Sequence, residues 1–508
     1  MSPFEGVFDY IILGAGSAGC ILAAMLAERL PDDRILLLEA GDDIPPHHET
    51  VWDPTKWVLV SRDRTLEWGY RSVAQRGLDG REIKLGRAKA LGGCSVHNAM
   101  VYVRGGAYGF DRWAREGCVG WAYEELLPYF ERVEERMHIT QAEMDPFIED
   151  LVVACNHMGI PYNPNYNTSP HQFGVSPFQF LISPGGQRET TFKNFLGARS
   201  HKNLHIASGV RFDRILFDHA RRAVAVAATD LRTQRQVEIH AGREILVAAG
   251  AIGSPHLLLL SGVGPESQLR DLGIPVVSAL PGVGENFQDD LFVTAMFLSK
   301  KPLPPQPYGL MGAVIFTSTD PSTLPYLTDV ECSLASGTME GLELSPDKRQ
   351  SYFIYPNLQL LGSRGTIKLA SPNPAEHPLI DPRYLEAPED IQRGIFCVEL
   401  ARRIGQDRGL SGWFAEEILP GPHVQTDAEM EAYIRRTADT CYHYAGTCKM
   451  GVDDMAVVTP DLEVRGTQGL RVVDASIIPT TVSGNTAAAT MMIAAKGADL
   501  VLASRRSA

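Results

Sequence analysis

Cysteine is scarce in this sequence, and none of its eight cysteines belongs to a C-x-x-C pair. A disulfide framework or a structural zinc site needs cysteines at characteristic spacings, so the sequence predicts neither, and no metal site is predicted. A small number of unpaired cysteines suits a reducing compartment. We therefore expect a cytoplasmic protein.

A basic surface and a membrane-spanning run are also missing. The 47 Lys and Arg residues are outnumbered by 61 Asp and Glu residues, which gives a formal net charge of −14. An acidic chain gains nothing from counterion release, so no nucleic-acid partner is expected. Residues 1–7 hold neither a basic segment nor an apolar signal core, and no apolar run approaches bilayer-spanning length. The nearest candidate, residues 487–502, contains Lys496 and Asp499 and is predicted to be a core helix.

The length and composition are those of a soluble globular protein. Hydrophobic residues make up 44% and charged residues 21% of the chain, and both values are ordinary. A chain of 508 residues is long enough for two domains or two interleaved lobes, each with its own core.

A glycine-rich turn follows the first apolar run of the chain. Residues 8–14, FDYIILG, are typical of a buried parallel strand. The turn continues as Ala-Gly-Ser-Ala-Gly, an apolar helical stretch covers residues 20–30, and a second strand over residues 34–38 ends on Glu39. This arrangement of strand, G-x-G-x-x-G turn, helix and acidic residue is typical of a dinucleotide-binding unit, whereas an isolated turn of this composition would be a plain glycine loop.

Each glycine of that turn has a physical task in dinucleotide binding. Gly14 permits the tight turn, Gly16 lets the backbone approach a pyrophosphate, and Gly19 lets the helix pack close to the strand. The helix N-terminus then faces the phosphate charge, and Glu39 accepts hydrogen bonds from ribose hydroxyls. These residues alone leave NAD and FAD open.

Later segments carry a resemblance to a known family. They read GRAKALGGCSVHNAMVYVRG over residues 86–105, GAIGSPHLLLLSGVGP over residues 250–265, YHYAGTCKMG over residues 442–451, GLRVVDAS over residues 469–476 and SGNT over residues 483–486. Their order and spacing resemble those of the glucose–methanol–choline (GMC) oxidoreductases over essentially the whole chain. The resemblance implies FAD as the cofactor and an enzyme that acts on CH–OH groups.

The family resemblance also implies the fold. We expect an α/β protein with mixed α+β character, in which a Rossmann-type FAD-binding domain is combined with a discontinuous substrate domain built on an antiparallel sheet backed by helices. Strand-like runs over residues 205–217, 223–229 and 236–248 support this, and a proline-rich break over residues 301–307 is predicted to mark the crossing into the second lobe. The expected FAD domain comprises residues 1–45, 80–115, 200–300 and 441–508, and the substrate domain with its cap segments comprises residues 46–79, 116–199 and 301–440.

Two residues are the catalytic candidates. Alcohol oxidation needs a base that works near neutral pH, which is the range of histidine, and polar groups that hold the developing alkoxide. In the family these are a histidine followed some forty residues later by His or Asn, and the match here is His443 and Asn485. The alternatives are a structural histidine bonded to a backbone carbonyl and an asparagine that only caps a helix.

His97 is a candidate for a covalent link to the flavin. Most family members have an aliphatic residue at this position, whereas the sequence Cys-Ser-Val-His-Asn resembles choline-oxidising members, in which the matching histidine is bonded to the flavin 8α-methyl group. The hypothesis is therefore an 8α-histidyl-FAD. The alternative is a histidine that packs over the dimethylbenzene edge of the flavin.

The remaining cofactor contacts are implied by the same motifs. We expect Val210 to meet the adenine through its backbone, Asp474 and Ala475 to lie near the pyrophosphate and ribityl chain, and Asn98 and Met100 to lie near the isoalloxazine. The full predicted set is Gly14, Gly16, Ser17, Ala18, Gly19, Glu39, Ala40, Leu91, Gly92, Ser95, His97, Asn98, Ala99, Met100, Val210, Asp474, Ala475, Asn485 and Thr486.

Two stretches depart from the family pattern. The carboxylate and the second histidine with which choline oxidase holds its substrate match Gly312 and Val330 here, which disfavours choline. Glu331 beside them is either a cation-binding residue or a solvated strand charge. The stretch Asn-Phe-Gln-Asp-Asp over residues 286–290 also departs, because the family usually ends it with His.

The predicted reaction is oxidation of a small-molecule alcohol to an aldehyde or ketone, with proton abstraction and hydride transfer to flavin N5. The electrons are expected to pass to O₂, as in an oxidase, and the alternative is a dehydrogenase that uses a quinone or a protein acceptor. A non-redox flavoprotein, such as a lyase or decarboxylase, and a flavin-binding protein without catalysis are further alternatives. A homodimer is the expected assembly.

Overall fold

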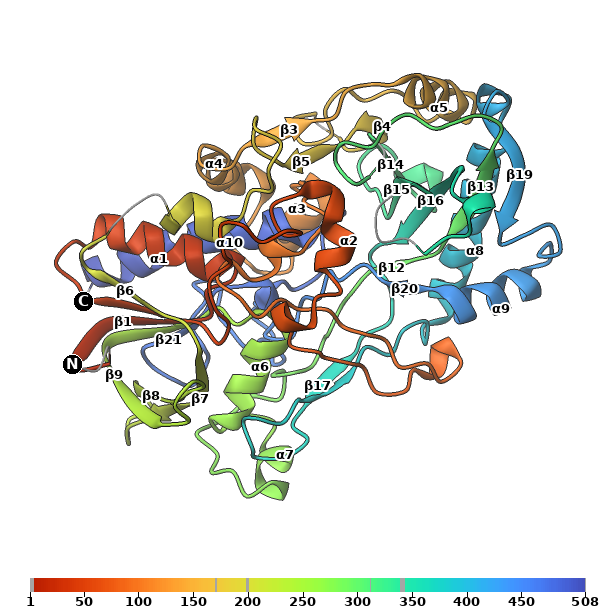
Figure 1. The fold of residues 1–508 in the computed structure, drawn as a ribbon. Helices are drawn as coiled ribbons and strands as arrows, with labels where there is room; N and C mark the ends of the chain where they lie inside the picture. The colour runs from red at the N-terminus through yellow and green to blue at the C-terminus, as the bar shows by residue number, and fades with distance from the viewer. Residues whose placement is uncertain (1–3, 170, 198–200, 311, 339–342, 508) are drawn as a thin grey trace.

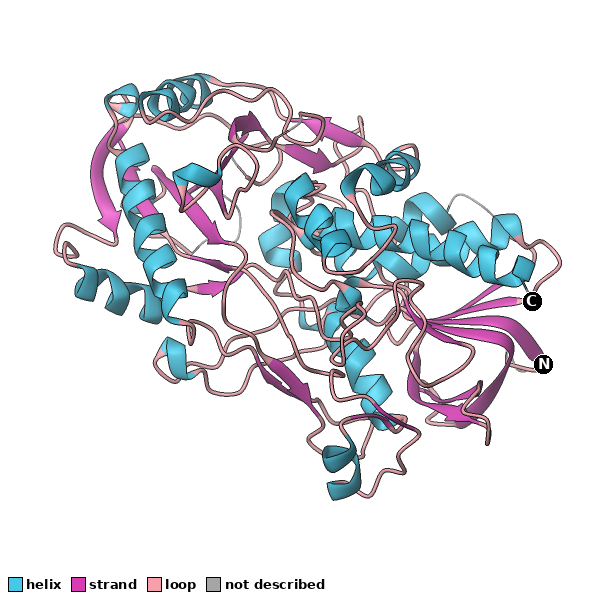
Figure 2. Ribbon diagram, turned by 180° about the vertical axis from the view of Figure 1, so that it is seen from behind, coloured by secondary structure: helices cyan, strands magenta, loops and turns pink. Residues whose placement is uncertain are grey.

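Two sheets organise the chain, and helices cover their faces (Figure 1). The computed structural model describes residues 4–169, 171–197, 201–310, 312–338 and 343–507. The first sheet lies beside the two chain termini, and the second occupies the opposite end of the molecule, as both ribbon views show (Figures 1 and 2).

The first sheet has seven strands and contains the predicted βαβ unit. Strand β1 is parallel to β2 on one side and to β9 on the other, and β21 joins as a parallel neighbour of β9. The edge beyond β9 is antiparallel. The strands are β1 (Val7–Leu13), β2 (Ile35–Leu38), β6 (Leu204–Ala207), β7 (Val210–Phe217), β8 (Ala223–Asp230), β9 (Gln236–Val247) and β21 (Leu470–Val472).

The second sheet has eight strands, and all its pairings are antiparallel. Its strands are β4 (Gly174–Pro177), β12 (Leu291–Phe292), β13 (Ala295–Ser299), β14 (Ala313–Thr317), β15 (Val330–Ser336), β16 (Ser351–Leu358), β19 (Phe414–Leu419) and β20 (Asp439–Thr440). Helices α8 (Pro388–Gly405) and α9 (Asp427–Thr437) pack beside it. The expected fold class, an FAD-type α/β domain with a second antiparallel sheet backed by helices, is confirmed.

The crossing between the sheets lies earlier than the proline-rich break predicts. Strands β12 and β13 precede residue 301, and both already pair with β16 of the second sheet. The break over residues 301–307 instead connects β13 to β14 within that sheet. The reason is that strand pairing, which residue composition does not encode, decides where the chain changes sheets.

Helix α1 (Ser17–Arg29) packs along α10 (Thr486–Ser507) above the first sheet (Figure 1). Residues 18–27 of α1 are all buried, as expected of a helix covered on every side. Contrary to the sequence expectation, the 20-residue stretch Thr486–Arg505 of α10 is long and apolar enough to cross a membrane. Because 67% of its most apolar window is buried inside the protein, α10 is a core helix.

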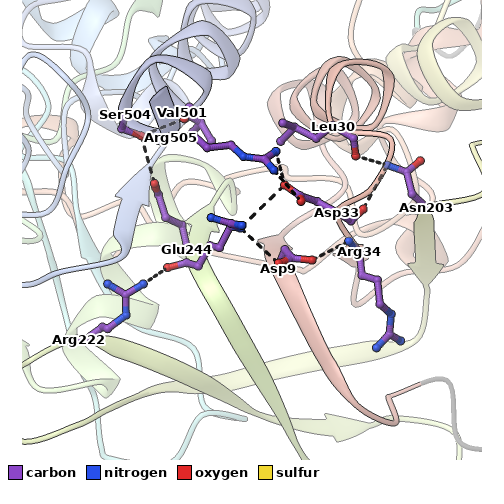
Figure 3. Close-up of polar contacts among 11 residues, drawn as sticks. Asp9, Leu30, Asp33, Arg34, Asn203, Arg222, Glu244, Val501, Ser504 and Arg505 are labelled. Atoms are coloured by element: carbon purple, nitrogen blue, oxygen red, sulfur yellow. Dashed lines mark hydrogen bonds and ion pairs between the residues drawn. The ribbon is translucent and has the colours of Figure 1, made fainter. Parts of the chain in front are cut away.

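The end of α10 is tied to the first sheet by polar contacts (Figure 3). The Arg505 guanidinium donates to Asp33 at 2.6 Å, and the Ser504 hydroxyl donates to Glu244 of β9 at 3.4 Å. Asp9 of β1 accepts from the backbone N–H of Arg34 at 2.9 Å. The contacts of Arg505 and Ser504 fix one end of α10, and its other end begins directly after Asn485.

The other elements connect and cover the two sheets. Three short two-stranded ladders are β3 (Ile139–Gln141) with β5 (Gln179–Leu181), β10 (Val263–Gly264) with β11 (Ser278–Ala279), and β17 (Thr366–Lys368) with β18 (Leu379–Asp381). The remaining α-helices are α2 (Trp57–Val60), α3 (Ala107–Arg115), α4 (Tyr123–Glu134), α5 (Pro146–His157), α6 (Gly250–Leu260) and α7 (Glu266–Asp271).

Candidate active site

The glycine turn between β1 and α1 is built as a close approach of backbones. Gly14 adopts a φ of +105°, and a Cβ on Gly19 would lie 1.8 Å from the Gly14 carbonyl oxygen. Only glycine fits at these two positions. The helix begins at Ser17 without a side-chain cap or an acidic residue in its first turn. Its N-terminus is therefore suited to an anionic group.

Glu39 holds the shape of this turn. One carboxylate oxygen accepts from the Ala15 N–H and the other from the Gly41 N–H, both at 2.9 Å. Burial raises the pKa of Glu39 to about 7, although these backbone donors act in the opposite direction. Ala40, which lies between Glu39 and Gly41 in the sequence, is buried. The predicted ribose contact of Glu39 stays a prediction.

The segment around Gly92 packs directly on the glycine turn. The Gly92 N–H donates to the Ala15 carbonyl at 2.8 Å, and the Leu91 N–H donates to the Asp42 carbonyl at 3.0 Å. A Cβ on Gly93 would lie 2.6 Å from Gly16 Cα. The paired glycines therefore let two loops of distant sequence close around one cradle.

The residues that follow form a tightly bonded 3₁₀ turn, Gly93–Val96. The Ser95 hydroxyl donates to the Gly92 carbonyl at 2.6 Å. Asn98 Oδ1 accepts from the Met100 N–H and from Arg188, each at 3.0 Å. Ala99 is half-buried and Met100 is fully buried. These side chains shape the loop.

The structure brings Asp474 and Ala475 to the end of β21, beside the start of α6. Asp474 Oδ2 accepts from the Gly250 N–H at 2.8 Å and from the Ser254 hydroxyl at 2.5 Å. Val210 begins β7, and its N–H donates to the Glu39 carbonyl at 2.8 Å. Val210 is thus bonded to the residue that holds the glycine turn, and Asp474 is bonded to the start of α6.

His443 and Asn485 meet side chain to side chain. Asn485 Nδ2 lies 2.9 Å from His443 Nε2, although 42 residues separate them in the sequence. His443 is 8% exposed. Asn485 directly precedes α10, and its Oδ1 is buried with no hydrogen-bond partner among the described residues, so this oxygen makes no capping bond there. Thr486, the first residue of the helix, is buried.

Two consecutive carboxylates hold His443 from the other side. Asp290 Oδ2 lies 2.9 Å from His443 Nδ1, and Asp289 Oδ1 accepts from the His443 backbone N–H at 2.8 Å. Asp289 also accepts from the hydroxyls of Tyr384 and Thr440. The sequence flagged this stretch only as a departure from the family pattern.

Burial and charge set the titration of this cluster. Burial acts to lower the pKa of His443, but its hydrogen bond to Asp290 and the negative charges of Asp290, Glu331 and Asp289 outweigh it and raise that pKa. Burial raises the pKa of Asp289 to about 6 and that of Glu331 to about 7. Glu331 is 0% exposed and accepts from Gln359 at 2.9 Å, so it is not a solvated strand charge.

His97 lies in a second polar group next to the paired glycines. His97 Nδ1 is 3.9 Å from Glu67 Oε1, and both atoms are buried without a hydrogen-bond partner among the described residues. Cys94 lies 3.5 Å from Arg87. Burial would raise the pKa of the Cys94 thiol, but the Arg87 charge and a hydrogen bond with His97 lower it to about 6.

Arg87 joins this group to the His443 loop. Its guanidinium donates to the carbonyl of Tyr442 and lies 4.1 Å from the centre of the Tyr444 ring. The residues flanking His443 are thus attached to the segment that carries His97 and the cradle. Sequence reasoning missed Arg87, Glu67, Asp289 and Asp290, and the only signal it had was the altered stretch at residues 286–290.

The fold and the site define an oxidoreductase that binds a dinucleotide cofactor. One connected region holds a glycine cradle that fits a pyrophosphate, a buried histidine, and an asparagine oxygen without a hydrogen-bond partner in the described part of the chain, and this combination suits FAD. The chain matches the GMC oxidoreductase family model for the N-terminal part over residues 8–292 and that for the C-terminal part over residues 362–494. The protein belongs to the GMC oxidoreductase family.

Individual relatives agree with this assignment. Mitochondrial choline dehydrogenase of Homo sapiens is 34% identical, and the alignment covers 97% of this chain and 89% of that protein. Alcohol dehydrogenase [acceptor] of Pseudomonas putida is 34% identical over 98% of this chain and 96% of that protein. Pyridoxine 4-oxidase from Mesorbium loti has a TM-score of 0.90 and 31% identity, with 97% of this chain and 98% of that chain covered. The protein is an FAD-dependent oxidoreductase that acts on CH–OH groups.

Proposed function

We propose that His443 is the base that takes the hydroxyl proton of an alcohol substrate, that Asn485 holds the substrate oxygen, and that the electrons pass through FAD to O₂. The observation that carries this proposal is the 2.9 Å contact between His443 Nε2 and Asn485 Nδ2. A substrate hydroxyl that replaces this direct contact would donate to His443 Nε2 and accept from the Asn485 amide. The product is an aldehyde or ketone.

The two residues have complementary tasks. A neutral imidazole offers a lone pair at Nε2 when Nδ1 carries the proton. The amide N–H of Asn485 is a fixed donor at the point where negative charge develops on the substrate oxygen, which is worth about 10²- to 10³-fold in rate for a comparable donor. FAD, when bound, supplies the acceptor for the hydride.

The residues proposed to hold FAD are those of the cradle. The start of α1 would face the pyrophosphate, and the segment from Leu91 to Met100 would contribute to holding the isoalloxazine. Asp474 and Ala475 would hold the phosphate end, and Val210 would meet the adenine. Hydrogen bonds from Gly92 to Ala15 and from the turn to Glu39 fix the shape of the cradle.

His97 is proposed as the site of covalent attachment. The proposal is supported by its burial beside the paired glycines and by a ring nitrogen without a hydrogen-bond partner among the described residues. The link would join a ring nitrogen to the 8α-methyl carbon, with loss of one methyl proton, and an electron acceptor such as O₂ would restore the oxidised flavin. Acid precipitation gives a yellow pellet if the link exists and a colourless pellet if it does not.

The choice of O₂ as acceptor is supported by the likeness to an enzyme named as an oxidase. A quinone or protein acceptor is the second candidate, because one relative of similar identity is named as an acceptor-dependent alcohol dehydrogenase. Oxygen uptake and peroxide formation during turnover would support the first, and turnover only with added quinone or dye would support the second. The cytoplasmic location and the homodimer stay predictions.

Flavin reduction tests the catalytic assignment. Anaerobic mixing with primary alcohols, amino alcohols, sugars and aryl alcohols identifies a substrate by bleaching of the flavin. With that substrate, His443→Ala should bind FAD normally and lose flavin reduction by several orders of magnitude.

A matched control variant is His157→Ala, which removes another aspartate-paired histidine, on α5, and should reduce the flavin at the normal rate. Retained single-turnover reduction in His443→Ala would refute the assigned base. Bleaching by no alcohol at all would favour the non-redox alternative.

A further inference from the structure

Asp290 and His443 are held against each other by backbone as well as by side chains. Asp290 directly precedes β12, and His443 lies three residues after the end of β20. The two strands pair antiparallel, with Leu291 opposite Thr440, and the Cys441 N–H donates to the Asp290 carbonyl at 2.9 Å. The labels of the two strands, which belong to the second sheet, lie side by side in Figure 1. The chain thus fixes the distance between two side chains that are 153 residues apart.

The side-chain contact defines which nitrogen carries the proton. Asp290 Oδ2 is 2.9 Å from Nδ1 of His443, and an ionised carboxylate only accepts hydrogen bonds. Nδ1 therefore carries the proton, and Nε2 presents its lone pair. The contact on the other side of the ring agrees, because Asn485 Nδ2 is a donor 2.9 Å from Nε2. One tautomer satisfies both neighbours.

Asp290 is engaged by little else. It is 0% exposed, and its second oxygen, Oδ1, is buried without a hydrogen-bond partner among the described residues. Asp289, by contrast, accepts from Tyr384, Thr440 and the His443 backbone N–H. A fully buried carboxylate whose hydrogen bond is to a single imidazole is costly for folding. Such a cost points to a role in the reaction.

We propose that Asp290 is the positioning residue for His443: it fixes the imidazole in the Nδ1–H tautomer and stabilises the imidazolium that forms when Nε2 takes the substrate proton. The inference rests on the proposed function, in which His443 is the base. The proton moves from the substrate hydroxyl to Nε2, while Nδ1–H stays bonded to the carboxylate. Asp290 stands where the family usually has a histidine, so the pair accounts for a departure that the sequence left unexplained.

Other charges around the imidazole act at longer range. Asp289 faces the backbone of the His443 loop, and Glu331 approaches from β15 and is bonded to Gln359. The thiol of the half-buried Cys441 has its pKa raised well above its usual value by desolvation and by these carboxylates. Within the described part of the chain, Asp290 is the only carboxylate hydrogen bonded to the ring. Removing it should therefore change the titration of His443 more than any other single substitution.

The test is the pH profile of anaerobic flavin reduction in Asp290→Asn. Loss of the negative charge should move the apparent pKa of the base to lower pH by about one unit or more. The Asn amide can donate to Nδ1 and select the wrong tautomer, so the limiting rate should also fall at least about tenfold, as it does by roughly 10⁴ when the aspartate of a catalytic triad becomes asparagine. Asp290→Glu should restore part of the rate.

Two further measurements keep the outcomes distinct. Asp390→Asn removes an equally buried carboxylate, which caps a loop in the second sheet region, and should keep the normal profile. If Asp290→Asn does not fold, ¹⁵N NMR of the histidines in the unmodified holoenzyme tests the same point, with the His443 signals identified by their loss in His443→Gln. A protonated Nδ1 and an unprotonated Nε2 at high pH are expected.

An unchanged pH profile and limiting rate in Asp290→Asn, or a protonated Nε2 in the holoenzyme, would overturn the role of Asp290. If His443→Ala still reduces flavin, the proposed function fails instead. The two failures are therefore separable.

Discussion

Asn485 and His443 approach each other to 2.9 Å from opposite parts of the site, one at the start of the C-terminal core helix and the other in the loop after β20. The contact leaves no choice in the direction of the hydrogen bond, because an amide nitrogen only donates. The imidazole nitrogen facing Asn485 is therefore an acceptor, which is the state that a base requires. Four predictions follow from this geometry and its surroundings.

Asn485→Ala should slow flavin reduction about 10²- to 10³-fold, because it removes the donor proposed to face the developing alkoxide. The measurement is the single-turnover rate by stopped-flow absorbance of the flavin. Thr490→Ala, on the same helix, removes a hydroxyl bonded only to the Thr486 carbonyl in the described structure and serves as the control. Equal rates in Asn485→Ala and the unmodified enzyme would contradict the assignment.

Flavin reduction should rise with pH through the pKa of His443. The neutral form is the base, and the negative charges around it raise its pKa from the ordinary 6.5, so the activity should be lost as pH falls through a value above 6.5. The limiting rate of flavin reduction from pH 5 to 9 gives this midpoint. A rate that is flat over this range, or that falls as pH rises from 6 to 8, would be inconsistent with His443 as the base.

Glu331 should make the protein less stable as pH rises. Its pKa is raised from 4.5 to about 7 by burial, so the folded state binds more protons than the unfolded state between these values. The free energy of unfolding is highest below the pKa of Glu331 in the unfolded state. It falls as pH rises through the pKa in the folded state, by up to on the order of 3 kcal/mol.

Glu331→Gln should therefore reduce the difference in unfolding free energy between pH 5 and pH 8, as measured by urea denaturation at both pH values. An isosteric amide keeps the shape of the site and can still accept from Gln359. An unchanged or larger difference would show that Glu331 does not titrate over this range.

Gly19→Ala should abolish FAD binding or folding. The new Cβ would lie 1.8 Å from the Gly14 carbonyl oxygen, a contact that requires the helix to move away from the strand and open the cradle. Flavin content after purification and far-UV circular dichroism measure both effects. Gly412→Ala, where a Cβ meets nothing within 4 Å, should leave both unchanged, and a flavin-replete Gly19→Ala protein would argue against this cradle.

The cofactor cradle was largely predictable from the sequence because its signals are local. The turn from Gly14 to Gly19 lies between an apolar strand and an apolar helix, and each residue's requirement can be stated from its neighbours. The proline-rich break misled because composition marks a loop without saying which sheet the next strand joins. The length of the apolar stretch in α10 was also underestimated. The sequence did not show that residues 486–505 form one continuous helix.

The partners of His443 could not be predicted in this way. Two adjacent aspartates and a strand glutamate are usually solvated surface charges, and the apolar residues beside them do not show which side chains are buried. Their burial follows from the pairing of β12 with β20 and of β15 with β16. The pairing of β12 with β20 joins segments that are more than a hundred residues apart in the sequence.

The sequence by itself determined the chemistry available to this protein: a glycine turn that only glycine can make, a family order of motifs, and a histidine and an asparagine in fixed positions within them. The tertiary structure alone decided how that chemistry is tuned. It placed Asp290 against Nδ1 of His443 and buried the ring to 8% exposure. Burial and strand register are properties of the whole chain, so the protonation state of the base is set by contacts that no local stretch of residues contains.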